Sequence, residues 1–182
     1  MPSKIIVCDY AAAWPDQFAQ LKRIIWPTVS DIALAIEHVG STAVAGLAAK
    51  PIIDLDIVIS SAPDLPAIIE RLKNLGYEHL GNLGIEGHEA FRAPPGPIDH
   101  HLYVCLAESI AFKNHIRLRD RLRNDALVRK QYGDLKRDLA LKFPDSIDAY
   151  VDGKTEFILN LLKDAGMAAP DLESIRNANK IF

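Results

Sequence analysis

The amino-acid sequence predicts an α/β (α+β) fold, in which a mixed β-sheet with flanking helices is followed by a helical part. Up to about residue 107, short apolar runs of strand length alternate with a few amphipathic segments. From residue 108 to 163 the pattern is helical and rich in Lys and Arg. We therefore divide the chain into a core of residues 1–107, a helical part of residues 108–167 packed on it, and a loosely ordered tail of residues 168–182.

Apolar runs predict the strands of the core. They lie at residues 4–8, 32–39, 52–59, 77–80, 88–92 and 98–106, and the connection Pro94-Pro95-Gly96-Pro97 joins the last two into a pair. One helix is predicted from Pro15 to about Pro27, which ends or bends it. A second spans residues 63–75 and is closed by Gly76, and the glycine-rich segment 81–87 is predicted to be a loop.

The helical part is predicted to contain three helices. Its periodic pattern breaks near Asn124-Asp125 and again at Pro144-Asp145. The third piece, residues 146–164, carries apolar residues at helical spacing along one face. Because the connection at residue 107 is short, we expect the two parts to form one unit.

Composition and charge narrow the classes of function. The 182 residues are enough for one domain with a hydrophobic core, and a net charge of −3 gives no bulk attraction to nucleic acid. No apolar segment reaches the length of a membrane span and the N-terminus lacks a signal-peptide pattern, so we expect a cytoplasmic protein. Cys8 and Cys105 lie in apolar stretches and fit buried thiols in a reducing compartment. The oligomeric state stays open.

The candidate catalytic and metal-binding residues are Asp54 and Asp56, which interrupt the apolar run 52–59. Residues two apart on a strand point to the same face, so the two carboxylates lie side by side. Such a pair repels and loses hydration unless a cation lies between them, and Mg²⁺ suits oxygen ligands at this spacing. The alternative is that both aspartates pair with Lys50 or with arginines of the helical part.

The turn Gly40-Ser41-Thr42 precedes this strand and is a candidate phosphate-binding segment. Glycine lets the backbone N–H groups of a turn approach a phosphate without a side chain between them. The alternative is a plain turn in which Ser41 or Thr42 caps a helix. Lys50 is either a phosphate ligand or a partner of Asp54, and we expect His38 to orient the turn by hydrogen bonding.

Strand 98–106 carries the next candidates. If Leu102 and Val104 face the core, His101 and Tyr103 share the opposite face, where His101 can reach the site. A zinc site is disfavoured because no Cys or His cluster occurs at ligand spacing.

Several motifs, in order along the chain, resemble one family. They are Glu37-His38-Val39-Gly40-Ser41-Thr42-Ala43-Val44, Ala49-Lys50-Pro51-Ile52-Ile53-Asp54, His100-His101-Leu102-Tyr103-Val104 and Leu118-Arg119-Asp120-Arg121-Leu122-Arg123. This set resembles the GrpB family of the nucleotidyltransferase-fold superfamily over roughly residues 5–165. The resemblance implies a nucleotidyltransferase-like sheet with Mg²⁺. Active nucleotidyltransferases of this fold usually carry a third acid on a neighbouring strand, and Asp99, which is not part of the family motif, is the candidate here.

Basic residues of the helical part complete the candidate site. Arg119 and Arg123 share one helix face and form either a phosphate clamp or a solvated basic face. Lys136 and Lys154 fall on motif positions of the later helices and are expected to close the same pocket. RNA binding is the minority interpretation, because exposed aromatic residues are not interleaved with the basic ones.

Two functions follow from the residues and the resemblance together. The first is a nucleotide-binding or phosphate-binding protein that uses Mg²⁺ and transfers a nucleotidyl group to an unknown acceptor. The alternative is a non-catalytic accessory or ligand-binding domain, related to a domain fused to dephospho-CoA kinase and linked to coenzyme A metabolism or to folding of a partner.

Overall fold

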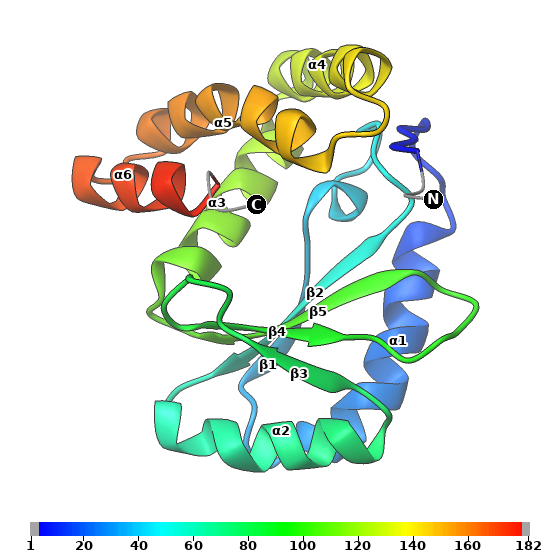
Figure 1. Ribbon diagram of the computed structural model, residues 1–182, viewed down its shortest axis with the longest axis vertical. Coiled ribbons are helices and arrows are strands. Elements are labelled where there is room, and N and C mark those ends of the chain that lie inside the picture. The colour runs from blue at the N-terminus through cyan, green and yellow to red at the C-terminus, as the bar shows by residue number, and fades with distance from the viewer. Residues whose placement is uncertain (1–3, 180–182) are drawn as a thin grey trace.

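The computed structural model describes residues 4–179 and confirms the predicted α/β fold with a mixed sheet. Five strands form one sheet in the order β1-β2-β5-β4-β3. They are β1 (Ala35–Val39), β2 (Ile53–Ile59), β3 (Glu78–Gly81), β4 (His88–Arg92) and β5 (His100–Leu106). Only β2 and β5 pair in parallel, and the other neighbours are antiparallel. Figure 1 shows the helical part of the chain on one side of this sheet and the helices that precede it on the other.

One face of the sheet is apolar and forms the main core. The helices α1 (Trp14–Val29) and α2 (Leu65–Asn74) cover it. Leu55 and Ile57 of β2 and Leu102 and Val104 of β5 point to this side and are at most 1% exposed. Burial of these branched side chains, at roughly 1.5–3 kcal/mol each, anchors the two central strands. It also directs the residues between them to the opposite face.

The second face carries polar side chains and lies under the helical part. That part contains α3 (Ile110–Asn124), α4 (Ala126–Lys142), α5 (Ile147–Asp164) and α6 (Ala169–Ala178). Ser109, Asp125 and Ser146 cap the first three of these helices, and each side chain accepts a hydrogen bond from a backbone N–H of the first turn. The predicted breaks at 124–125 and 144–145 therefore mark real helix ends.

Three local predictions differ from the structure. Residues 4–8 form no strand beyond a single bridge from Cys8 to Ala49. Pro27 does not end α1, because it lies in the last turn and the helix continues to Val29. Residues 169–178, expected in a loosely ordered tail, form α6, which packs through Ile175 and Leu172 against apolar residues of α3 and α5. Two apolar residues are too few to give a helical pattern, so the sequence alone does not predict α6.

No helix in the described part of the chain is long and apolar enough to cross a membrane.

Gly133 in the middle of α4 tests how closely the helical part packs on the core. A Cβ added there would lie 3.6 Å from the Cβ of Ala48, an ordinary contact distance. Glycine costs about 0.5–1 kcal/mol relative to alanine inside a helix. We therefore expect Gly133→Ala to raise the free energy of unfolding by up to about 1 kcal/mol, measured by urea denaturation. A loss of stability would mean that α4 lies closer to the 44–48 segment than the structure shows.

Candidate functional site

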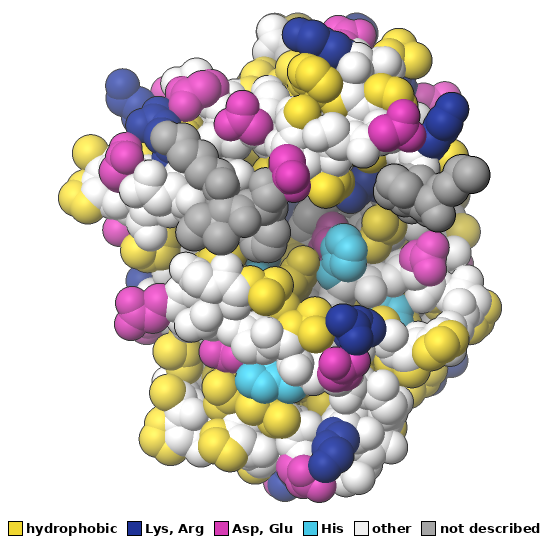
Figure 2. All heavy atoms as spheres, viewed as in Figure 1, with side chains coloured by type: hydrophobic (Ala, Val, Ile, Leu, Met, Phe, Trp, Pro, Cys, Tyr) yellow, Lys and Arg dark blue, Asp and Glu magenta, His cyan; other side chains and the backbone are white. Residues whose placement is uncertain are grey.

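A cavity of about 250 Å³ lies between the polar face of the sheet and the helices α3–α5. In Figure 2 the molecule is hollowed between the helical part and the sheet, and a histidine side chain lies at the hollow. The structure brings most of the predicted site residues to this cavity: Gly40, Ser41, Thr42, Lys50, Asp54, His101, Arg119, Lys136 and Lys154 all line it. Asp56, Arg123 and Asp99 are not among its lining residues.

The turn after β1 packs directly on Asp54. Gly40 has a φ of +68°, and a Cβ at this position would lie 2.1 Å from Asp54 Oδ2. Only glycine tolerates both the left-handed backbone and this contact. Thr42 holds the turn from behind, because its hydroxyl donates to the Ile52 carbonyl at 3.2 Å and lies 3.1 Å from His38 Nε2. This bond confirms the predicted role of His38 in orienting the turn.

Asp54 opens to the cavity and pairs with a histidine. The parallel register of β2 and β5 places His101 beside it. His101 Nδ1 lies 2.8 Å from Asp54 Oδ1, and the Asp54 side chain remains 27% exposed. The position on the neighbouring strand nearest to Asp54 is therefore held by an imidazole rather than by a carboxylate.

Asp56 faces the same side of the sheet but is fully buried. Its Oδ2 lies 2.7 Å from Nδ1 of His115, a residue of α3. Burial lowers the pKa of His115, but the Asp56 carboxylate more than offsets this, so the pKa is raised overall. The two aspartates, predicted as one metal-binding pair, thus face different neighbours.

Three lysines converge on the cavity, from α4, from α5 and from the segment before β2. Lys136 of α4 is 2% exposed and its Nζ donates to Ser41 Oγ at 2.7 Å. Its ammonium also lies 4.6 Å from the ring centroid of Tyr132. Lys154 of α5 lies 4.4 Å from the ring centroid of Tyr150, and Lys50 approaches the same ring at 5.9 Å. Aromatic faces thus hold the ammonium groups in place without neutralising them.

The charges of the cavity are unbalanced. The pKa of Lys136 is lowered to about 6 and that of Lys154 to about 8, in each case mainly by burial and in part by a neighbouring lysine. Burial also lowers the pKa of Lys50. Among the described residues that line the cavity, Asp54 is the one carboxylate. The cavity therefore gathers three poorly hydrated lysines around one carboxylate, and a bound anion would stabilise their protonated forms.

Arg119 and Arg123, the two arginines of α3 that were predicted to bind phosphate, bind other parts of the protein. Arg119 Nη1 donates to Glu37 Oε2 at 2.7 Å and to the His38 carbonyl at 3.1 Å. Arg123 donates through Nε and Nη2 to the Ala43 carbonyl, at 3.1 and 2.8 Å. Arg119 still lines the cavity, whereas Arg123 holds the turn from outside it. Both side chains fix α3 against the segment that carries Ser41.

Asp99 lies at the surface, before β5, and its backbone carbonyl accepts a hydrogen bond from the N–H of Ile53. Among residues 4–179, no third carboxylate joins Asp54 and Asp56 in a group of ligand atoms close enough to share a metal ion. Glu37, opposite Asp56 on β1, is paired with Arg119. The geometry does not provide the three-carboxylate set that is usual in active nucleotidyltransferases of this fold.

The sequence matches the family described as "GrpB protein" over residues 4–164. The chain belongs to the GrpB family. Glutamate-rich protein GrpB of Alkalihalophilus pseudofirmus is 31% identical over 166 residues, covering 88% of this chain and 95% of that protein. UPF0157 protein YqkA of Bacillus subtilis is 34% identical over 155 residues, which are 85% of this chain but 45% of that protein.

Solved structures confirm the fold of this GrpB family member. The crystal structure of conserved protein GrpB from Enterococcus faecalis has a TM-score of 0.79 at 33% identity, covering 88% of this chain and 96% of that one. Terminal uridylyl transferase 4 from Trypanosoma brucei has a TM-score of 0.50 at 14% identity, over 96% of this chain and 66% of that one. The fold is therefore nucleotidyltransferase-like. A dephospho-CoA kinase of Mycobacterium tuberculosis is 28% identical over 103 residues, 54% of this chain and 25% of that protein.

Sequence reasoning missed four residues around the site: His88, His115, Tyr132 and Tyr150. His115 lies four residues before Arg119, so helical spacing alone places both on one face of α3. Burial lowers the pKa of His88, on β4, to about 4. The position of His88 in the sequence does not predict its approach to Asp56, because β5 lies between β4 and β2 in the sheet.

Lys136 gives the site a characteristic pH dependence. We expect Lys136→Met to stabilise the ligand-free protein by about 1–4 kcal/mol near pH 6, because it replaces a buried charge by an apolar side chain of similar size. The folded-state pKa of about 6 lies below the unfolded value, so the unfolded wild type binds more protons from about pH 6 to about pH 10. Wild-type stability due to this group therefore rises with pH across that window.

The advantage of the variant should accordingly be largest at about pH 6 and shrink towards about pH 10. Urea unfolding of both proteins at several pH values measures this difference directly. A difference that stays constant over the series would mean that Lys136 keeps its proton in the folded protein throughout.

Proposed function

We propose that this GrpB family member binds a nucleotide or another phosphate-containing small molecule, with the phosphate groups in the cavity lined by Lys50, Lys136 and Lys154. The observation that carries the proposal is the convergence of these three lysine side chains on a cavity with one carboxylate. Burying cations without anionic partners is costly, and a phosphate would offset that cost. Ser41 adds a hydroxyl that already accepts a hydrogen bond from Lys136.

The size of the cavity supports a phosphate subsite rather than a pocket for a whole ligand. Its volume of about 250 Å³ lies below the roughly 300–1,000 Å³ of pockets that enclose complete small molecules. The remainder of the ligand would therefore occupy the mouth of the cavity. The structural neighbour from Trypanosoma brucei was solved with bound UTP, so nucleoside triphosphates are the first ligands to test.

The site fits Mg²⁺ only if the phosphates of the ligand supply part of the ion's coordination. Mg²⁺ commonly binds one or two carboxylates and takes its other oxygens from substrate phosphates and water. Asp54 would hold the ion, because it is partly exposed and lines the cavity. Asp56 is closed off by burial and by its bond to His115. When bound, the ion would align the phosphates and reduce their charge.

Nucleotidyl transfer is the second candidate function. The histidines that pair with the two strand aspartates argue against it. Both strand aspartates are paired with histidines, and His101 stands beside Asp54 where a third acid would complete a catalytic metal site. Ligand binding without catalysis needs no such acid. The similarity of 103 residues to a quarter of a mycobacterial dephospho-CoA kinase supports an accessory, ligand-binding role in coenzyme A metabolism.

Lysine variants test the phosphate subsite. We expect Lys136→Met to weaken binding of ATP or UTP by about 10-fold or more in isothermal titration calorimetry, because a charge-assisted hydrogen bond contributes about 1.5–3 kcal/mol. Lys142→Met is the matched control, since Lys142 lies on the same helix and is exposed. Equal affinities of wild type and both variants, at fixed salt, would reject the subsite.

A carboxylate variant separates the role of Mg²⁺ from that of the lysines. We expect Mg²⁺ to raise the affinity of the wild type for a nucleoside triphosphate, and Asp54→Asn to remove that increase while Mg²⁺-free binding remains. Asp99→Asn is the control, because Asp99 is exposed and outside the cavity. The same incubations measure pyrophosphate release. Release that requires Asp54 would establish transfer, and its absence with retained binding supports the accessory role.

A further inference from the structure

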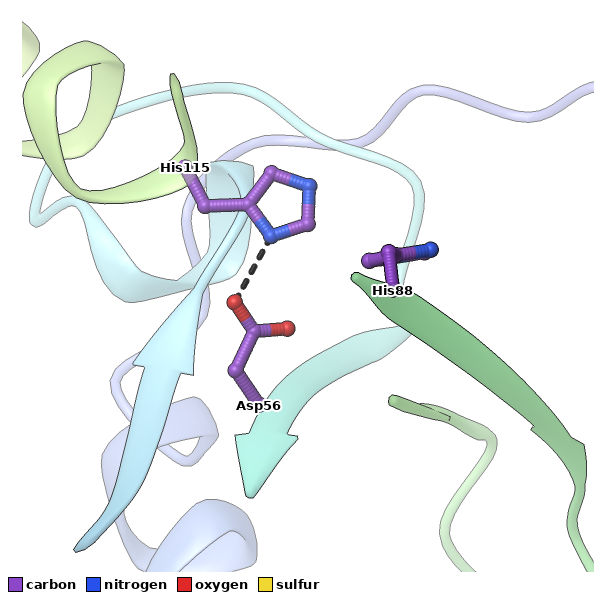
Figure 3. A group of neighbouring side chains, drawn as sticks. All are labelled: Asp56, His88 and His115. Carbon is purple, nitrogen blue, oxygen red and sulfur yellow. Dashed lines mark hydrogen bonds and ion pairs between the residues drawn. The ribbon is translucent and has the colours of Figure 1, made fainter. Parts of the chain in front are cut away.

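A second polar group lies behind the phosphate cavity. Asp56 of β2, His88 of β4 and His115 of α3 each offer one ligand atom, and these atoms lie within 4.8 Å of one another. Figure 3 shows the three side chains converging from three elements, with His115 Nδ1 directed at the Asp56 carboxylate. Asp56 is fully buried and His88 is 6% exposed, whereas the side chain of His115 is 28% exposed.

The group contains polar atoms without hydrogen-bond partners. Asp56 Oδ1 and both ring nitrogens of His88 are buried, and none of them has a partner among residues 4–179. Buried polar atoms are nearly always paired, because an unpaired one loses its hydration without compensation. Here the unpaired atoms belong to a carboxylate and an imidazole, and they lie beside a third ligand-type side chain. A bound cation would satisfy the carboxylate oxygen and one nitrogen of His88 together.

We propose that Asp56, His88 and His115 bind one divalent first-row transition-metal ion, of which Zn²⁺ is the representative. Two imidazole nitrogens and one carboxylate oxygen form a donor set typical of zinc and of non-haem iron, whereas Mg²⁺ prefers oxygen ligands only. The present hydrogen bond of 2.7 Å between His115 and Asp56 would be replaced by two bonds to the shared ion. The proton of that bond leaves when the ion binds.

The proposed ion would have a free coordination position that faces a cavity. A cavity of about 780 Å³ next to the group is lined by His88, Tyr103 and His115. Three protein ligands leave a coordination position for water or for a ligand atom, as in catalytic rather than structural zinc sites. His115 also lines the phosphate cavity, so the ion would lie between the two cavities. The ion would also fix α3 to the sheet, because its ligands belong to both.

The test uses chelator-treated full-length protein and ZnCl₂ in isothermal titration calorimetry. We expect one ion per chain, and we expect His88→Gln and His115→Gln each to weaken binding by about 100-fold or more. His79→Gln is the matched control, because His79 pairs with Glu89 on the other side of β4 and is outside the group. A large excess of Mg²⁺ should not compete. Binding that is equal in all three variants would overturn the proposal.

A measurement on the wild type keeps the proposal testable if a variant fails to fold. The chain has six histidines, so nitrogen NMR of ¹⁵N-histidine-labelled protein can follow each imidazole. We expect Zn²⁺ to shift the ring nitrogens of two histidines, and Co²⁺ to give the visible absorption of a four- or five-coordinate site. Shifts at surface histidines, or no shift at one equivalent of Zn²⁺, would overturn it.

The metal site and the phosphate subsite can fail independently. Lys136→Met should weaken nucleotide binding and keep Zn²⁺ binding, because Lys136 is not one of the three metal ligands. His88→Gln should lose Zn²⁺ binding and keep nucleotide binding, because His88 does not line the phosphate cavity. Loss of both properties in His88→Gln, with the fold intact by circular dichroism, would contradict the assignment of two separate sites.

Discussion

The carboxylate of Asp54 touches the turn at Gly40 and pairs with His101, and this contact connects the parts of the molecule that form the site. The turn carries Ser41, which receives Lys136 from α4, and the Ala43 carbonyl nearby receives Arg123 from α3. This partly exposed acid thereby helps to determine where two helices of the helical part rest. A side chain larger than hydrogen at position 40 would separate the turn from the acid and displace both helices' anchoring points.

The sheet separates apolar packing from charge by alternation along its strands. On β2 and β5 the same residues that fill the core with α1 and α2 leave Asp54, Asp56, His101 and Tyr103 on the opposite face. A polar face is costly to cover, and the helical part covers it with side chains that are themselves polar or aromatic. The result is a layer of polar and charged side chains between the apolar core of the sheet and the apolar cluster of the helical part. Both proposed binding sites lie in this layer.

Much of this arrangement is predictable from the sequence, because local rules apply to it. The two-residue period places Asp54 and Asp56 on one face, glycine at position 40 indicates a close approach, and the helix ends follow from their capping residues. The family motifs point to Lys136 and Lys154, which periodicity alone does not distinguish from other helix residues. Their partners, Tyr132 and Tyr150, lie four residues earlier on the same helices.

The group of Asp56, His88 and His115 shows where such rules end. Ligand spacing along the sequence disfavours zinc, because these three residues lie on three elements and up to 59 residues apart. Only the sheet order and the docking of α3 bring them together.

The residue beside Asp54 on β5 decides which chemistry this fold can support here. A carboxylate at position 101 would add a third oxygen donor to the cavity and favour a magnesium site built by the protein. Histidine instead donates a hydrogen bond to Asp54 and lowers the negative charge of the site. The positive groups of the cavity are its lysines, and the ligand that we propose for it is therefore a phosphate. Asp56 shares no ligand group with Asp54, and its neighbours are the imidazoles of His88 and His115. The proposed division of the two aspartates between an anion site and a nitrogen-rich cation site thus depends on the imidazole that lies beside Asp54 on β5.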